Sequence, residues 1–235
     1  SYTNRTIDLR NNQLMEATIE PATDEEIQNT IKVMGGEDWI LWIKALKEAG
    51  VLADGAKTVA YSYIGPELTY PIYKEGSIGQ AKKDLYASAD KIQAEIDGVE
   101  AYVSVNKAVV TQSSAAIPIV PLYLAILFKV MKEQKVQEGC IEQMYRMIHD
   151  RLCNGGAVVT DENRLIRMDD WEMEPKVQEA VAEIWQKIDQ DNLEEVTDLE
   201  GYWQEFYEIF GFRIDGVDYG ADVDADVQIP SIAAE

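Results

Sequence analysis

A tyrosine and a lysine nine positions apart are the side chains of this sequence best suited to chemistry. Tyr73 and Lys82 follow an apolar run at residues 58–64. A tyrosine held beside a lysine can polarise a carbonyl oxygen during hydride transfer. The hydroxyl donates a hydrogen bond to the developing oxyanion, and the cation lowers the cost of phenolate character. Because this spacing also occurs by chance, the surrounding elements decide whether the two side chains meet.

The helix that carries Lys82 limits how the pair can converge. Ser77 can cap a helix over residues 78–96, and nine positions at 100° each place two side chains on opposite faces of one continuous helix. Tyr73 therefore reaches Lys82 only if it lies before the helix. Gly76 and Ser77 supply such a break in the chain.

Two other polar segments follow predicted strands. Tyr63 lies at the end of the run 58–64, beside the turn Gly65-Pro66, and ligands bind at the carboxyl ends of strands in α/β sheets. A packed tyrosine with its hydroxyl at the rim is the alternative. Residues 111–114, Thr-Gln-Ser-Ser, follow a second apolar segment. They can offer hydroxyls and backbone N–H groups to a carboxamide or a phosphate, although polar loops are common in that position.

Strands alternate with helices along the chain, which indicates an α/β fold with a parallel sheet. A buried strand is predicted at residues 58–64. Further strands are predicted at 101–105 and 165–168, with 109–111 extending or following the second. Helices are predicted at 24–34, 38–49, 78–96, 118–134, 138–152, 175–188 and 199–209. The opening stretch through residue 19 is predicted to be irregular or an edge strand. So few strands cannot complete a doubly wound sheet, and no linker divides residues 1–235, which we expect to form a single unit.

Composition restricts the partners. The chain has 43 acidic and 21 basic residues, a formal net charge of −22, which argues against nucleic acid or an anionic membrane as a partner. The longest apolar run, residues 115–130, contains two prolines and a lysine and predicts no membrane span.

Cys140 and Cys153 form no metal-ligand pattern and no disulfide framework, which indicates a reducing compartment. The sequence contains no GxGxxG turn and no P-loop, and we expect no metal site.

Seven longer strings of residues occur in an order that can be compared with known families. They are VMGGEDW at 33–39, AYSYIGP at 60–66, SVNKA at 104–108, VTQ at 110–112, FKVMKE at 128–133, EGCIEQ at 138–143 and MDDWE at 168–172. Together they resemble the trans-2-enoyl-CoA reductase family, which includes the bacterial enoyl-acyl-carrier-protein reductases of the same type. The active-site pattern of that family is Tyr-x8-Lys, and Tyr73 and Lys82 match it.

The resemblance implies a reaction and a set of roles. The reaction is NADH-dependent reduction of trans-2-enoyl thioesters in fatty acid metabolism, on an elaborated Rossmann-type fold. Tyr73 is implied as the proton donor and oxyanion partner, and Lys82 as the residue that touches NADH and tunes the tyrosine. Tyr63 is implied to face the acyl thioester. The residues implied along the nicotinamide are Val110, Thr111 and Gln112.

Members of the family also carry an N-terminal half with the glycine-rich turn, and this sequence resembles their C-terminal half only. We therefore expect the cofactor site to be completed by another segment or by a second polypeptide, and the chain alone to be inactive. The alternative is a reductase-derived, non-catalytic structural subunit of a larger assembly. The sequence leaves open the length of the acyl chain, whether the substrate is carried by CoA or by acyl-carrier protein, and whether the cofactor is NADH or NADPH. It also leaves open whether the compartment is a mitochondrion or the bacterial cytoplasm.

Overall fold

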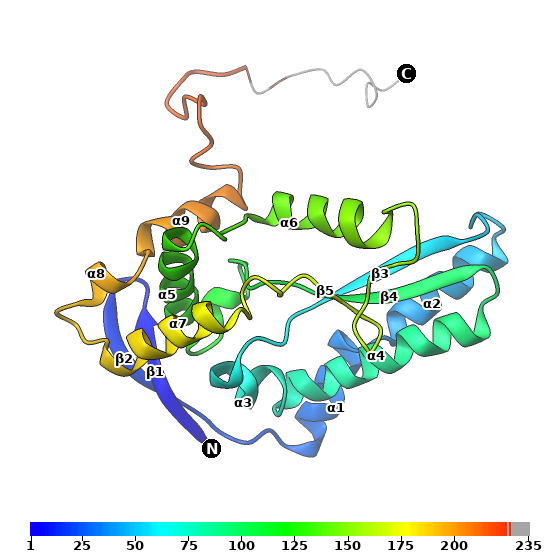
Figure 1. Cartoon of the computed structure of the whole chain (residues 1–235), viewed down its shortest axis with the longest axis horizontal. Coiled ribbons are helices and arrows are strands. Elements are labelled where there is room, and N and C mark those ends of the chain that lie inside the picture. The colour runs from blue at the N-terminus through cyan, green and yellow to red at the C-terminus, as the bar shows by residue number, and fades with distance from the viewer. Residues whose placement is uncertain (225, 227–235) are drawn as a thin grey trace.

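The chain folds around a short parallel sheet and a separate hairpin (Figure 1). The computed structural model describes residues 1–224 and 226. The sheet has the order β3 (Ala56–Ser62), β4 (Val99–Val105) and β5 (Leu165–Arg167), and both pairings are parallel. The hairpin consists of β1 (Tyr2–Asp8) and β2 (Gln13–Ile19), paired antiparallel. The prediction of a helix-rich α/β fold with a few parallel strands is confirmed.

Helices account for most of the regular structure, and most lie where the sequence predicts them. The α-helices are α1 (Asp24–Met34), α2 (Glu37–Glu48), α3 (Tyr70–Tyr73), α4 (Ser77–Glu95), α5 (Val120–Glu133), α6 (Cys140–Arg146), α7 (Pro175–Lys187), α8 (Leu193–Val196) and α9 (Leu199–Glu208). The single helix predicted over residues 138–152 is α6 followed by a π-helical turn, Met147–Leu152. The short helices α3 and α8 were not predicted.

Helices cover both faces of the parallel sheet. Ala101 and Val103 of β4 pack with Ile92 of α4 and Ile43 of α2 on one face. Because neighbouring side chains of a strand point to opposite faces, Tyr102 lies on the other face and packs with the turn after α6. Figure 1 shows α2 and α4 on one side of the strands and α6 on the other.

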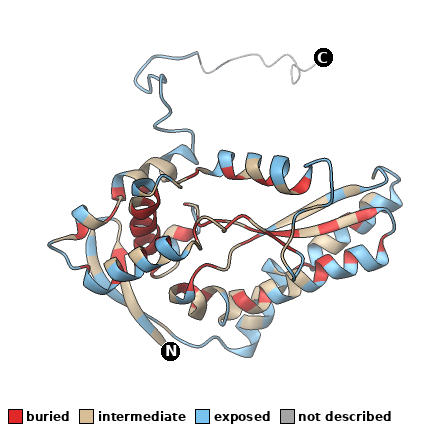
Figure 2. Ribbon diagram, viewed as in Figure 1, coloured by how far each residue is buried: buried red, intermediate tan, exposed pale blue. Residues whose placement is uncertain are grey.

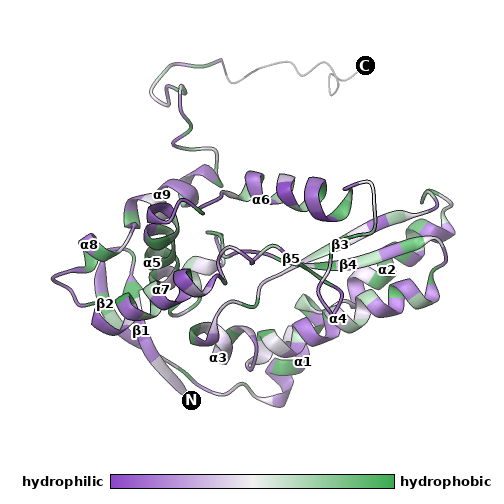
Figure 3. Cartoon of the chain, in the orientation of Figure 1, coloured by the Kyte–Doolittle hydropathy of each residue, from purple (hydrophilic) through white to green (hydrophobic). Residues whose placement is uncertain are grey.

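Helix α5 forms the centre of the larger core. Its sequence is apolar all round, as expected of a helix enclosed on every side. It packs against the hairpin strand β1 and against α7 and α9. Figure 2 shows α5 buried along most of its length, and Figure 3 shows its hydrophobic character. Within the described residues, no helix has the length and apolar character needed to cross a membrane.

The first predicted strand is less buried than expected. Of the residues of β3 only Ser62 is buried, and Tyr61 is 59% exposed. β3 is an edge strand, since among the described residues it pairs with β4 alone. The position of β3 at the edge of the sheet explains its low burial. The apolar pattern of residues 58–64 does not specify the order of the strands in the sheet.

Two further predictions were wrong in local detail. Residues 109–111 form no strand, because the backbone leaves the sheet after β4 and side chains take its N–H groups. Lys107 N–H donates to Gln143 Oε1 at 2.8 Å and Ala108 N–H to Glu172 Oε2 at 2.7 Å. Ser77 is the first residue of α4 and makes no capping hydrogen bond, and Gly76 occupies the cap position.

Candidate active site

The break between α3 and α4 sets the position of the tyrosine relative to the lysine. Tyr73 is the last residue of α3, and Gly76 is extended (φ −77°, ψ −173°) before α4 begins at Ser77. The prediction that Tyr73 stands before the helix of Lys82 is confirmed. Gly79 makes this junction possible, because a Cβ at that position would meet the backbone carbonyl of Lys74. The end of α3 can therefore lie against the first turn of α4.

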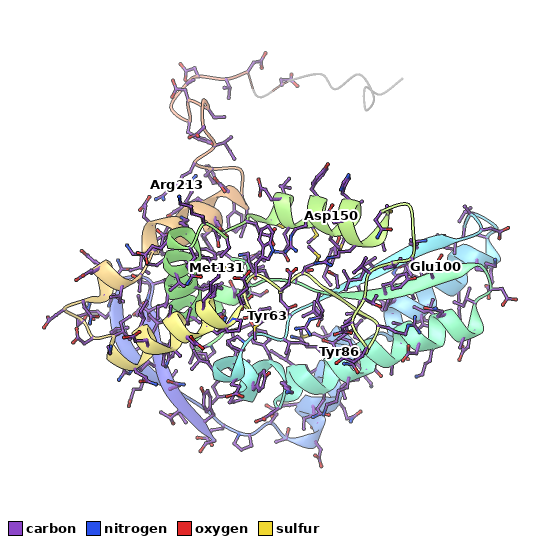
Figure 4. All side chains as sticks on the ribbon, in the orientation of Figure 1. Tyr63, Tyr86, Glu100, Met131, Asp150 and Arg213 are labelled. Atoms are coloured by element: carbon purple, nitrogen blue, oxygen red, sulfur yellow. The ribbon has the colours of Figure 1, made fainter. Side chains whose placement is uncertain are left out.

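The three side chains singled out by the sequence come together. Lys82 Nζ lies 4.5 Å from the ring centroid of Tyr73 and 5.7 Å from that of Tyr63. The two tyrosine rings are perpendicular, with centroids 4.9 Å apart. Tyr63 follows β3, so residues from a strand end and from two helices share one location. Figure 4 shows Tyr63 in the interior of the molecule.

These side chains line a cavity of about 290 Å³. Its walls come from the end of β3, from α3 and α4, from the loop after β4 and from the start of α5. They are Met34, Tyr61, Ser62, Tyr63, Thr69, Tyr73, Ile78, Lys82, Asn106, Lys107, Ala108, Val109, Thr111, Ser114, Val120, Tyr123 and Leu124. These lining residues include two lysines and no acid, although the chain as a whole has a net charge of −22. The titratable side chains that line the cavity are therefore basic or tyrosine, within an acidic protein.

The lysine of the pair is unusual in its surroundings. Lys82 Nζ is buried and has no hydrogen-bond partner within the part of the chain that the structure describes. Burial lowers the pKa of Lys82 to about 7. A buried ammonium that only aromatic rings face is poised to bind an acceptor that enters the cavity.

The tyrosine of the pair stays protonated at neutral pH. Burial raises the pKa of Tyr73 to about 12, and the negative charge of Glu172 adds to the effect. The expectation that the lysine cation lowers the cost of phenolate character stays a prediction. The ammonium of Lys82 lies over the ring of Tyr73, and burial determines the direction of the pKa shift. Tyr73 is thus suited to donate a proton or a hydrogen bond.

A glutamate that the sequence did not single out lies directly behind the tyrosines. Glu172 is fully buried, and its Oε1 accepts hydrogen bonds from the hydroxyls of Tyr63 (2.9 Å) and Tyr123 (2.7 Å). Its Oε2 accepts from Ala108 N–H. Glu172 belongs to one of the family strings, but it lies 109 positions from Tyr63, and no local spacing links the two residues.

A second buried lysine neighbours this glutamate. Lys107 is 1% exposed, and its ammonium donates to the carbonyl of Ala108 at 2.8 Å. Burial lowers the pKa of Lys107, and the nearby charge of Glu172 opposes that shift. Burial raises the pKa of Glu172, and the hydrogen bonds from Tyr123 and Ala108 together with the positive charge of Lys107 oppose that shift.

The residues predicted along the nicotinamide do not lie in one place. Thr111 lines the cavity, whereas Val110 packs in the core around α5. Gln112 is exposed and is not among the lining residues. Thr111 is also tied to Ser114 by three hydrogen bonds of 2.8–3.0 Å, so the loop has a fixed shape.

Two family models match the chain. Residues 1–153 match the trans-2-enoyl-CoA reductase catalytic region, and residues 160–223 match the enoyl reductase FAD binding domain. No lining residue of the cavity belongs to the second region. Its inward-facing side chains, such as Val177 and Tyr202, instead pack against α5 in the core. Glu172 also belongs to that region, and it reaches the cavity from behind, through the hydroxyls of Tyr63 and Tyr123.

Individual relatives agree with the first match. The chain is 53% identical to the trans-2-enoyl-CoA reductase [NADH] of Ruminiclostridium cellulolyticum, over 99% of this chain and 59% of that protein. It is 52% identical to the enoyl-[acyl-carrier-protein] reductase [NADH] of Psychromonas ingrahamii, over 99% and 59%. The crystal structure of Treponema denticola trans-2-enoyl-CoA reductase in complex with NAD superposes with a TM-score of 0.90 at 49% identity, covering 94% of this chain and 56% of that one.

The chain thus spans somewhat more than half the length of these relatives. The similarity runs through the whole of the described fold, and the predicted family and Rossmann-type α/β fold are confirmed. The chain belongs to the trans-2-enoyl-CoA reductase family.

Proposed function

We propose that this chain carries the catalytic residues for NADH-dependent reduction of trans-2-enoyl thioesters. One observation carries the proposal: the hydroxyl of Tyr73 and the amino group of Lys82, which has no hydrogen-bond partner among residues 1–224 and 226, lie at one cavity. Relatives that share about half of its residues are named for this reaction, on CoA or on acyl-carrier-protein substrates.

On the substrate side, Tyr73 has the central role. Addition of a hydride to the β-carbon of an enoyl thioester moves negative charge onto the thioester oxygen. A hydroxyl whose pKa is about 12 is fully protonated at neutral pH, so Tyr73 can donate a hydrogen bond to that oxygen as the charge develops. The α-carbon of the enolate then takes a proton. Apolar lining residues, among them Ile78, Val120 and Leu124, can surround the acyl chain and exclude water.

On the cofactor side, the residues present fit the reacting end of NADH. The cofactor supplies the hydride when bound. Lys82 offers a buried ammonium that no other described side chain or backbone group binds, and Thr111 offers a hydroxyl at the same cavity. An ammonium and a hydroxyl are groups to which the ribose hydroxyls and the carboxamide of NADH can form hydrogen bonds. A volume of about 290 Å³ lies at the lower end of ligand pockets, so it suits the reacting end of a dinucleotide and not the whole molecule.

We further propose that the pyrophosphate of NADH binds to residues outside this chain. Two observations support this. The sequence has no glycine-rich turn of the kind that binds a dinucleotide. The outer edge of β3 is also unpaired within the described residues, so it can accept further strands. The relatives carry their matching region within one longer chain, which favours residues of the same polypeptide over a separate subunit. The non-catalytic alternative is disfavoured, because the residues that the chemistry needs lie together.

An assay of NADH oxidation with crotonyl-CoA tests the proposal, on this chain and on the longest natural form of the protein. We expect Tyr73→Phe to lower kcat by about 100-fold or more, the usual effect of removing a donor to an oxyanion. Tyr70→Phe is the matched control. It removes a hydroxyl three residues away in the same helix, from a side chain that does not line the cavity.

Two results would contradict the proposal. Reduction that survives Tyr73→Phe at the wild-type rate would remove the role of Tyr73. No turnover in the longest natural form would favour the non-catalytic alternative. Absorbance of the purified protein gives a separate check on the cofactor, because a flavin spectrum would show that NADH is not the only redox group.

A further inference from the structure

The hydroxyl of Tyr63 donates its hydrogen bond to Glu172. Glu172 faces three donors, the hydroxyls of Tyr63 and Tyr123 and the N–H of Ala108. Burial raises the pKa of Glu172, whereas the two hydroxyls, the Ala108 N–H and the charge of Lys107 all favour the carboxylate, and we take Glu172 as ionised on the strength of these four groups. The Tyr63 proton therefore points to Glu172, behind the cavity wall.

The neighbouring tyrosine has the opposite arrangement. No hydrogen bond ties the hydroxyl of Tyr73 to any other described residue, although Tyr73 lines the same cavity. A thioester oxygen can only accept hydrogen bonds. Tyr63 can thus offer such an oxygen a lone pair but no proton, whereas Tyr73 can donate.

We propose that Glu172 is a positioning residue that divides the roles of the two tyrosines: it holds Tyr63 as a hydrogen-bond acceptor and leaves Tyr73 as the donor. The inference rests on the proposed function and goes beyond it, because the resemblance implied Tyr73 as the proton donor but gave Tyr63 no hydrogen-bonding role and Glu172 no role at all. An acceptor oxygen at Tyr63 can bind a donor group inside the cavity, such as the ammonium of Lys82, whose Nζ lies 5.7 Å from the Tyr63 ring centroid.

The groups around Glu172 maintain this state. Lys107, which follows β4, contributes a positive charge, and Tyr123 of α5 contributes a second hydroxyl. Gln178 of α7 donates to the hydroxyl oxygen of Tyr123 at 3.2 Å and to the Glu172 carbonyl at 2.7 Å, so the Tyr123 proton must also point to the carboxylate. Two acids, Glu138 and Glu205, face Lys107 as well and favour its charged form.

Glu172→Gln should reverse the polarity of this network. The N–H of Ala108 is an obligate donor, so the amide of the variant must turn its oxygen to Ala108. Its NH₂ group then faces the two tyrosine hydroxyls and donates to them. Both hydroxyls become acceptors toward residue 172, and the proton of Tyr63 is free to point into the cavity.

A rescue experiment tests this consequence in the longest natural form of the protein. Tyr73→Phe removes the tyrosine hydroxyl that is free to donate. In the double variant Tyr73→Phe/Glu172→Gln, Tyr63 can donate in its place, and we expect kcat to recover by about tenfold relative to Tyr73→Phe alone. Tyr123→Phe in the same background is the matched control, because it removes a hydroxyl from the same oxygen of Glu172 and keeps the charge. Recovery in the control, or none in the double variant, would overturn the proposal.

A measurement without turnover separates this inference from the proposed function. In protein labelled with ¹³C at the tyrosine Cζ, we expect Glu172→Gln to lower the pKa of Tyr73 by about one unit, because a nearby negative charge is lost. Tyr123→Phe should leave the pKa of Tyr73 raised. An unchanged Tyr73 pKa in Glu172→Gln would refute the role of Glu172, whatever the activity. Absence of reduction in the wild type would instead refute the proposed function.

If Glu172→Gln does not fold, substitutions of the tyrosines still decide the matter. With Glu172 intact, Tyr63→Phe should lower kcat by less than about tenfold, whereas Tyr73→Phe should lower it by about 100-fold or more, since of the two tyrosines Tyr73 alone can donate. Equal losses in the two variants would show that both hydroxyls donate to the substrate, and would overturn the division of roles.

Discussion

Replacing Lys82 by methionine is expected to stabilise the fold while it removes a residue of the proposed site. Lys82 is buried against two aromatic rings and its ammonium has no hydrogen-bond partner among the described residues. Methionine keeps an unbranched side chain of similar length and packs well against aromatic rings. The substitution therefore removes the buried charge and leaves the apolar contacts in place.

The magnitude follows from the pKa of Lys82, which burial lowers from 10.5 to about 7. Below about pH 7 the folded and the unfolded chains both carry the proton, and the folded state bears the whole cost of the buried charge. At 1.36 kcal/mol per unit, that cost is at most about 5 kcal/mol. Above about pH 7 the folded state loses the proton first, so the cost falls as pH rises, to about 2 kcal/mol near pH 9 and to none beyond the unfolded pKa.

Urea unfolding of the wild-type chain and Lys82→Met at about pH 6 and about pH 9 measures this difference. We expect the variant to have the higher free energy of unfolding at both values, with the larger gain at the lower pH. The pH should stay below 10, because the raised pKa of Tyr73 makes stability fall with pH between 10 and about 12. Lys83→Met is the matched control. Lys83 is the exposed neighbour in α4, and its substitution should change stability by less than about 0.5 kcal/mol at either pH.

A gain that is the same at both pH values would show that packing, and not charge burial, explains it. A loss of stability in Lys82→Met at the lower pH would refute the reasoning altogether, because it would mean that the ammonium has a partner in the folded protein. A residue that costs stability and yet lies in the proposed site is the expected signature of a functional group.

Three further substitutions test the elements that hold the site. Gly79→Ala should destabilise the chain by about 1–3 kcal/mol and lower the rate of NADH oxidation, because its Cβ would push Lys74 and the end of α3 away from α4. Phe128→Ala should cost about 3–5 kcal/mol in urea unfolding, since Phe128 is fully buried in the core around α5. Arg146→Met should cost about 3–5 kcal/mol by leaving the buried carboxylate of Glu138 unpaired, and adding Glu138→Gln should restore part of that loss in the same assay.

Local features of the fold were predictable, because short-range interactions determine them. Thr23 and Glu26 form a capping box at the start of α1, which is one of the predicted helices. The helical period and the glycine before α4 were enough to show that Tyr73 had to precede the helix of Lys82. The resemblance of the seven strings correctly indicated the family.

Features that depend on contacts between distant segments were not predictable. The low burial of β3 follows from its place at the sheet edge, and strand order is a property of the assembled sheet. The loop after β4 is not a strand, because side chains from α6 and from the segment after β5 take its N–H groups.

The sequence by itself determined which residues could do chemistry and that a chain break lets Tyr73 and Lys82 meet, since both depend on spacing of a few residues. Only the tertiary structure decided the state of those residues. Burial raises the pKa of Tyr73 and lowers that of Lys82, and Glu172 reaches Tyr63 from 109 positions away. Desolvation and long-range hydrogen bonds arise only when the core closes. The tyrosine and lysine pair was visible in the sequence, but its protonation was not.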